Sequence, residues 1–138
     1  MLLDTHIALW LDTGDLSLRP PTRDAIDAHW KQGGTIYLSA VTVWEIAMLV
    51  DKGRVALDHS VEAWTGRFLD QPGVEAAPLS LGAAMRGYRF PELEHSDPAD
   101  RLLIAAAIDL GCPLVTYDSR IRRFGERHGE QYGFSVTG

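Results

Sequence analysis

The sequence predicts an α/β domain in which a parallel sheet carries helices on both faces. Three observations support this fold class: strand candidates alternate with helix candidates, the segment 102–110 (LLIAAAIDL) is apolar nearly all round, and no repeat or linker interrupts the pattern. A helix that is apolar on every side packs centrally. The chain has 138 residues, 46% of them hydrophobic, and so predicts one domain over 1–138 with a substantial core.

The first half of the chain predicts two strands and three helices. Residues 1–3 are apolar and end at an acid, as a buried first strand does, and a short helix is expected over 5–11. Pro21 suits a first helical turn, so the segment 17–21 should hold a helix start, and a helix over 22–31 should stop at Gly33 and Gly34. The β-branched and aromatic segment TIYLS (35–39) predicts the second strand, and a helix over 41–51 follows it.

The second half continues the alternation. Ser60 is a suitable N-cap for a helix over 61–69, and Pro72 with Gly73 closes that helix. A short strand over 74–78, a helix over about 81–88 and a loop over 90–96 come next. Asp97 followed by Pro98 predicts the start of a helix over 98–110. Strands are expected over 114–117 and, at an edge, over 134–136.

Composition narrows the class of protein. The single cysteine, Cys112, excludes an internal disulfide framework and is typical of a reducing cytoplasm. The apolar start MLLDTHIALWLD has no basic segment or cleavage site of a signal peptide, and no stretch approaches the roughly 20 apolar residues of a membrane span. We therefore expect a soluble, cytoplasmic protein that does not enter the membrane.

The net charge of −6 argues against a nucleic-acid partner, because phosphate-binding proteins usually carry a basic patch. However, Arg120, Arg122, Arg123 and Arg127 fall within eight positions just after Asp118. Such a run is typical of a solvated helix face. It could equally hold phosphates, provided that a bound cation offsets the acidic residues nearby.

Acidic residues from distant parts of the chain are expected to meet at one edge of the sheet. Asp4 ends the first strand and Asp118 ends the strand in PLVTYD, and the carboxyl ends of parallel strands share an edge. Glu45 lies about one and a half turns into the helix after TIYLS, and Asp100 lies in the first turn of its helix. Helices packed antiparallel to the strands begin at the same edge.

Carboxylates that converge in this way repel one another unless a cation neutralises them. A site rich in oxygen and free of sulfur favours Mg²⁺ or Mn²⁺ over zinc, and such an ion can activate water against a phosphodiester. Each acid alone also has a structural explanation. Asp97 can cap a helix, and Asp100, in the first turn, can be stabilised by the helix dipole. Asp4 and Asp118 can form turns at the ends of their strands. Glu45 can belong to a capping box that starts at Thr42, although Ser39 is an equally good cap.

Three segments carry a family resemblance: LLDTHIALW (2–10), SAVTVWEIAMLVDKGRV (39–55) and HSDPADRLLIAAAIDLGCPLVTYD (95–118). In this order they resemble a PIN domain, in particular the VapC-type toxin ribonucleases of bacterial and archaeal toxin–antitoxin pairs. The resemblance implies a three-layer fold with about five parallel strands flanked by helices. It also implies an endoribonuclease that depends on Mg²⁺ or Mn²⁺.

Carried over residue by residue, the resemblance assigns site residues and partners. The acidic residues implied to be catalytic and to bind the metal are Asp4, Glu45, Asp100 and Asp118. The string H-x-D-P-x-D-R and the residue after the first acid imply the supporting residues Thr5, His95, Asp97 and Arg101. Arg120, Arg122 and Arg123 are candidates for RNA contact. The implied partners are tRNA or ribosomal RNA as substrate, a VapB-like antitoxin that blocks the acidic pocket, and a second copy in a homodimer.

One departure and two alternatives remain. The segment after Asp118, RIRRFGERHGEQYGFSVTG, is longer and more basic than usual in that family. A phosphatase of the haloacid-dehalogenase type also has an aspartate after its first strand, but it needs a second acid two residues later, where this chain has His6. The other alternative is an inactivated PIN domain that serves as a binding or assembly module. All four acids are present, which favours activity.

Overall fold

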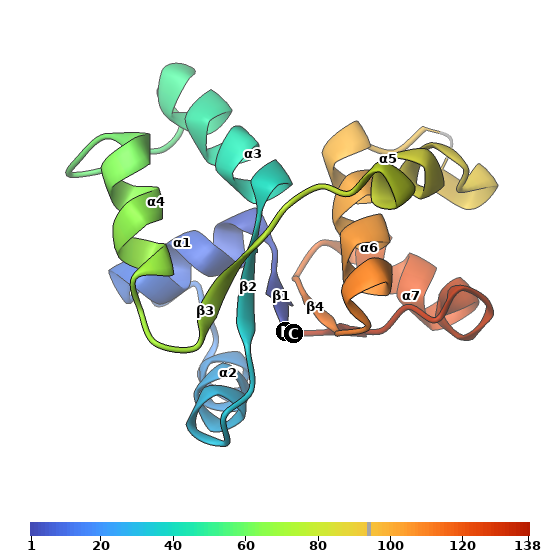
Figure 1. Cartoon of the computed structure of the whole chain (residues 1–138), viewed down its shortest axis with the longest axis horizontal. Coiled ribbons are helices and arrows are strands. Elements are labelled where there is room, and N and C mark those ends of the chain that lie inside the picture. Colours follow the sequence, from blue (N-terminus) through green and yellow to red (C-terminus); the bar gives the residue numbers. More distant parts are fainter. Residues whose placement is uncertain (94) are drawn as a thin grey trace.

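The computed structural model describes residues 1–93 and 95–138 and shows a five-stranded sheet between two layers of helices (Figure 1). The strands are β1 (Leu2–Leu3), β2 (Ile36–Ser39), β3 (Val74–Ala77), β4 (Leu114–Val115) and β5 (Val136–Thr137). Their order in the sheet is β3-β2-β1-β4-β5, and every neighbouring pair is parallel. The predicted fold class, a parallel sheet of about five strands flanked by helices, is confirmed.

The helices follow the strands in regular alternation. They are α1 (Thr5–Thr13), α2 (Pro20–Lys31), α3 (Ala40–Asp51), α4 (Val61–Leu69), α5 (Leu81–Tyr88), α6 (Pro98–Leu110) and α7 (Ser119–Tyr132). A short 3₁₀ helix, η1 (Pro91–Leu93), lies within the predicted loop 90–96, of which residue 94 is outside the described residues. Most predicted elements are confirmed: α4, α5 and α6 have the predicted bounds, and the bounds of the others differ by one or two residues.

The two faces of the sheet carry separate parts of the core, because successive strand side chains point to opposite faces. Leu2 and Leu114 face the cluster formed with α5, α6 and α7, whereas Leu3 and Val115 face the cluster formed with α1, α2 and α4. Figure 1 shows these two groups of helices on opposite sides of the sheet. Burial of both faces explains why β1 and β4 are apolar without alternation.

Helix α6 is central to its layer, as its apolar sequence predicts. Its residues from Leu103 to Ala107 are all buried, and α5 packs closely along it. The close approach depends on Gly87, because a Cβ there would lie 3.1 Å from Leu102 Cδ2 and 3.3 Å from the carbonyl oxygen of Arg101. The start of α6, which carries Asp100, is thus held against a neighbouring helix.

The end of the chain differs most from the prediction. β4 stops at Val115 rather than at position 117, and β5 is Val136–Thr137 rather than 134–136, because Phe134 turns into the core instead of extending the sheet. The helix α7 was not assigned to any predicted element. Its sequence is mostly charged and contains Gly125 and Gly129, so its apolar stripe is narrow.

Among the described residues, no helix combines the length and the apolar character that crossing a membrane requires.

Candidate acidic active site

The order of the strands creates a crevice between β1 and β4. The helix after β1, α1, packs on one face of the sheet, whereas α7, which follows β4, packs on the other. In open α/β sheets, ligands bind outside the carboxyl ends of the strands at such a point. Asp4 follows β1 directly and Asp118 follows β4, so the fold places both acids at this crevice.

Asp4 and Asp118 each cap the helix that follows. The Asp4 Oδ1 atom accepts a hydrogen bond from the backbone N–H of Thr5 at 2.7 Å. The Asp118 Oδ1 atom accepts from the backbone N–H groups of Arg120 at 2.8 Å and Ile121 at 3.0 Å. The helix ends therefore fix the direction of both carboxylates. The structural role that the sequence offered as an alternative coexists with a place at the crevice.

Thr116 joins these two acids and was missed by the sequence analysis. Its fully buried hydroxyl donates a hydrogen bond to Asp4 Oδ2 and accepts one from the backbone N–H of Asp118 at 3.0 Å. The backbone N–H of Asp4 also donates to the carbonyl of Val115 at 3.0 Å. The signal in the sequence was the hydroxyl residue two positions before the acid in PLVTYD, but only the pairing of β1 with β4 places it beside Asp4.

Glu45 reaches the site from α3. Ser39 caps this helix, since its Oγ accepts from the N–H of Val41 at 3.1 Å, so the alternative cap at Thr42 is wrong. Glu45 is thereby set about one and a half turns into the helix. The Thr5 hydroxyl donates to Glu45 Oε1 at 2.7 Å and so links the start of α1 to α3.

Asp97 and Asp100 come from the start of α6. The Asp97 Oδ1 atom accepts from the N–H of Ala99 at 2.9 Å, with Pro98 in the first turn, so its predicted role as a cap is confirmed. Asp100 lies in the first turn and is half-buried. Its carboxylate makes none of the side-chain hydrogen bonds found among the described residues. Unlike Asp4, Asp97 and Asp118, it does not cap a helix.

The electrostatic interactions show that the acids form one cluster. Burial and, after it, the negative charges of Asp118, Asp97, Asp4 and Glu45 raise the pKa of Asp100 to about 7. Burial also raises the pKa of Asp4 and that of Glu45. The hydroxyl groups of Thr116 and Thr5 oppose these shifts, because each donates to the ionised form. The four predicted acids are therefore brought together, with Asp97 beside them.

The donor set fits a hard divalent cation. Carboxylate and hydroxyl oxygens make up the cluster, and a cation would relieve the repulsion that raises the pKa of Asp100. Within residues 1–93 and 95–138, no group of three or more His, Cys, Asp or Glu side chains has the arrangement of a complete metal site. Mg²⁺ usually takes one or two carboxylates directly and keeps several waters, so it does not need such a group.

Comparison with known proteins identifies the family. The model of the PIN domain matches residues 1–127. The chain belongs to the PIN-domain family. This PIN domain is 30% identical over 122 residues to ribonuclease VapC22 of Mycobacterium tuberculosis, covering 88% of this chain and 89% of that protein. The resemblance to VapC-type PIN domains, inferred from the motifs, is confirmed.

A solved structure shows the same fold. The crystal structure of VapBC2 from Rickettsia felis, bound to a DNA fragment from its promoter, contains a chain that matches this PIN domain with a TM-score of 0.66. The sequences are 17% identical, and the match covers 99% of this chain and 96% of that chain. At this identity the likeness concerns the fold.

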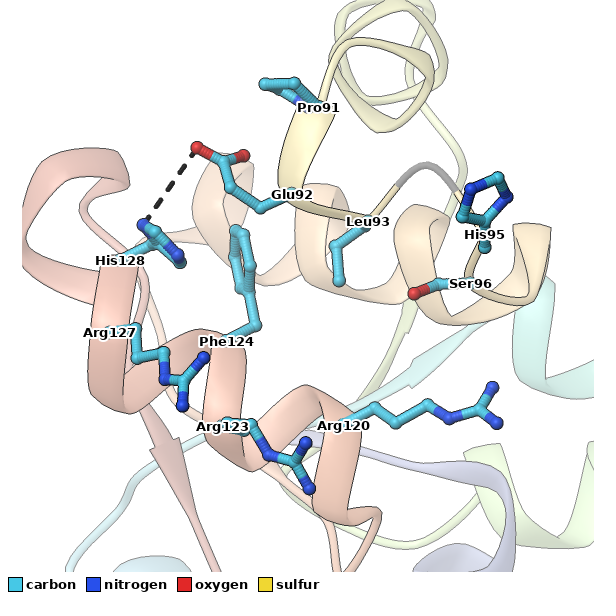
Figure 2. A pocket seen from close by; sticks show the side chains of 10 residues that line it. All are labelled: Pro91, Glu92, Leu93, His95, Ser96, Arg120, Arg123, Phe124, Arg127 and His128. Atoms are coloured by element: carbon cyan, nitrogen blue, oxygen red, sulfur yellow. Dashed lines mark ion pairs between the residues drawn. The ribbon is translucent and has the colours of Figure 1, made fainter.

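The predicted supporting residues Arg101 and His95 occupy different surroundings in this PIN domain. The Arg101 guanidinium donates to the backbone carbonyls of Gly87 at 2.7 Å, Leu93 at 3.3 Å and Tyr88, so it ties α6 to α5 and η1. Its observed contacts are therefore with the backbone around the site. His95 lies between η1 and α6 and lines a cavity beside α7 (Figure 2).

The three arginines predicted to contact RNA do not act as one group. Arg120 and Arg123 line the same cavity as His95, together with Arg127, which the sequence analysis did not include among the site residues. Arg122 instead donates to the carbonyl oxygen of Gly138 at 2.6 Å and so holds the last described residue against α7. The spacing of the arginines separates them only once residues 119–132 are known to form a helix, because the direction of each side chain depends on its place around the helix.

Proposed function

We propose that this PIN domain is a divalent-metal-dependent endoribonuclease of the VapC type. The observation that supports the proposal most directly is the acidic cluster at the crevice between β1 and β4, in which burial and, after it, neighbouring carboxylates raise the pKa of Asp100 to about 7. Natural proteins rarely keep such mutually repelling groups for stability, and perturbed pKa values gather at functional sites. The relative in Mycobacterium tuberculosis carries the name ribonuclease.

The proposed roles follow from the contacts of each side chain. Asp4, Glu45 and Asp100 surround an Mg²⁺ or Mn²⁺ ion, which binds one or two of these carboxylates directly and the rest through its waters, and Asp118 completes the site through water or at a second ion. Such an ion supplies an activated water and offsets the charge of the phosphodiester. Thr116 and Thr5 orient the oxygens of Asp4 and Glu45 through the hydrogen bonds described above.

The proposed substrate is a structured RNA, tRNA or ribosomal RNA, and the proposed setting is the cytoplasm. We also propose a VapB-like antitoxin as partner, supported by the VapBC2 structure, one chain of which shares this fold. Co-expression with the product of the neighbouring reading frame tests the pairing: the two proteins should co-purify. Purification of the PIN domain without that product bound to it would contradict this part of the proposal.

The catalytic proposal predicts the effect of two substitutions. Asp100→Asn and Asp4→Asn keep the size of each side chain but remove a charge that the metal needs, so each should reduce RNA cleavage by at least about a hundredfold. Cleavage of labelled tRNA and ribosomal RNA is measured after chelation and defined addition of Mg²⁺ or Mn²⁺. The control is Asp58→Asn, an exposed aspartate outside the cluster, which should cleave like the wild type.

Far-ultraviolet circular dichroism of all three variants checks that the fold is retained. Cleavage by Asp100→Asn at the rate of the wild type, in the same metal series, would show that the acidic cluster is not the catalytic site. A wild-type protein that binds RNA but cleaves none with any divalent ion would instead identify an inactivated PIN domain that serves as a binding module.

A further inference from the structure

A basic cavity lies beside the acidic cluster, between α7 and the segment that joins η1 to α6. Its volume is about 510 Å³. It is lined by Pro91, Glu92, Leu93, His95, Ser96, Arg120, Arg123, Phe124, Arg127 and His128. Figure 2 shows the three arginine side chains extending from one side of α7, with Ser96 and His95 across from Arg120.

The cavity holds more positive charge than its surroundings neutralise. Arg120, Arg123 and Arg127 are exposed and stand three and four positions apart, which places them on one face of α7. In the part of the chain that the structure describes, none of them forms an ion pair. Three guanidinium groups on one helix face that have no ion-pair partner within residues 1–93 and 95–138 are unexpected in a chain whose net charge is −6.

Glu92, the acidic residue that lines this cavity, is already engaged. Its carboxylate lies 3.9 Å from His128 Nδ1 and accepts hydrogen bonds from the hydroxyl of Tyr132 at 3.0 and 3.1 Å. These contacts hold η1 against α7 and keep the carboxylate at the far end of the cavity from Arg120 (Figure 2). The arginines are thus left available to an anion that comes from outside.

The position of the cavity links it to the acids. Arg120 follows Asp118 by two residues on α7, and His95 precedes Asp97 by two residues before α6. One end of the cavity, at Arg120 and His95, therefore lies near the starts of α7 and α6, which carry Asp118 and Asp100. From Arg120 to Arg127 the helix rises roughly 10 Å, which is long enough for more than one phosphate of a single strand.

We propose that this cavity binds the phosphate backbone of the RNA beside the bond that is cleaved, through Arg120, Arg123 and Arg127. Guanidinium groups bind phosphate oxygens in a bidentate manner, and such contacts position a nucleic acid without reading its sequence. The inference rests on the proposed function, because RNA is there the proposed substrate. It adds Arg127 to the substrate contacts and excludes Arg122, whose guanidinium is bound to the backbone.

The test compares two double variants of equal charge. Arg123→Ala with Arg127→Ala removes two cavity arginines, and Arg54→Ala with Arg67→Ala removes two exposed arginines elsewhere. Binding of a fluorescein-labelled single-stranded RNA is measured by anisotropy in chelator, so that no cleavage occurs, over a range of salt concentrations. The cavity variant should bind at least about tenfold more weakly. The slope of log Kd against log salt concentration should fall by about 1.4, because two phosphate contacts to a single strand are lost. The control should stay within about twofold of the wild type.

A kinetic measurement separates binding from chemistry. With saturating RNA and metal, the cavity variant should keep its kcat within about twofold while its KM rises, because the lost contacts lie away from the reacting atoms. Arg123→Lys with Arg127→Lys should restore most of the salt dependence but less of the affinity, since lysine cannot form the bidentate contact.

The possible outcomes distinguish this inference from the proposed function. If the cavity variant binds RNA like the wild type while Asp100→Asn abolishes cleavage, the inference is wrong and the function stands. If the cavity variant loses RNA binding while Asp100→Asn still cleaves, the inference about the cavity stands and the proposed catalytic site is wrong. If the cavity variant loses the wild type's binding to a labelled polyglutamate peptide but binds RNA unchanged, the inference is wrong, and the cavity binds an acidic protein segment instead.

Discussion

Asp4 and Asp118 each use one carboxylate oxygen to cap a helix, and the buried Thr116 hydroxyl links Asp4 to the backbone of Asp118. These contacts restrict both side chains to one orientation. The Asp100 carboxylate has no such hydrogen bond among the described residues, and burial together with four neighbouring carboxylates raises its pKa. A cap and a ligand are therefore compatible roles for one aspartate.

The raised pKa of Asp100 predicts how stability depends on pH without metal. The pKa is about 7 in the folded chain against 3.8 without the fold, so the folded state keeps a proton that the unfolded state releases. The stability that the folded chain gains by keeping this proton is fully present below about pH 4 and is lost as the pH rises through about 7. In chelator, the Tm of the wild type should fall between about pH 5 and pH 8, and that of Asp100→Asn should fall less.

At about pH 8 the Asp100→Asn variant should melt above the wild type, because it has no charge to desolvate. The decrease of Tm with pH that remains in the variant is caused by Asp4 and Glu45, because their pKa values are also raised. Asp58→Asn should follow the wild type at every pH. Parallel curves for the wild type and Asp100→Asn would contradict the electrostatic coupling.

At the scale of the elements, α6 was predicted with its observed bounds, as were α4 and α5. Its start at Asp97 and Pro98, its end at Leu110 and its central position all follow from its sequence. In contrast, α7 was missed, because arginines and glycines obscure an apolar stripe that consists mainly of Ile121 and Phe124. Its amphipathic pattern becomes effective only where the sheet offers an apolar face.

The cap of α6 can be measured separately from the charge of Asp97. Asp97→Asn loses the charge but keeps an oxygen that accepts from the N–H of Ala99, whereas Asp97→Ala loses both. Urea denaturation should therefore show Asp97→Ala to be about 1 kcal/mol less stable than Asp97→Asn. Equal stabilities of the two variants would mean that Pro98 and tertiary packing alone fix the start of α6.

At the scale of the molecule, one apolar surface is left uncovered. An apolar groove between α3, α6 and the segment that joins β3 to α5 is lined by Ala40, Val41, Trp44, Leu79, Pro98, Ala99 and Leu102. Trp44 and Leu79 in this groove are 63% and 38% exposed. We propose that a second copy of the chain covers this surface, in line with the homodimer that the family resemblance implies. That residues 1–138 form a single domain also stays a prediction.

Sedimentation velocity tests the dimer. The wild type should sediment at about twice the chain mass of 15.2 kDa, and Trp44→Glu with Leu79→Glu, which places two charges in the groove, should sediment as a monomer. The control is Leu16→Glu, because Leu16 is 95% exposed but lies outside this surface. A monomeric wild type, or a dimer that tolerates both glutamates, would exclude this surface as the interface.

The sequence by itself determined the alternation of strands and helices, the caps at Ser60 and Asp97, and the family, because these depend on local backbone preferences and on side-chain periodicity. It also indicated that Asp4, Glu45, Asp100 and Asp118 share an edge, since parallel strands end together.

Only the tertiary structure decided the rest. The order of the strands placed Thr116 beside Asp4, and the packing of α7 directed Arg122 to Gly138 while Arg120, Arg123 and Arg127 line one cavity. Burial and the neighbouring acids raised the pKa of Asp100. Each of these depends on which segments become neighbours across long stretches of chain. Hydrogen bonds and charge interactions act over a few ångströms of space, so their partners follow from the packing and not from proximity in the sequence.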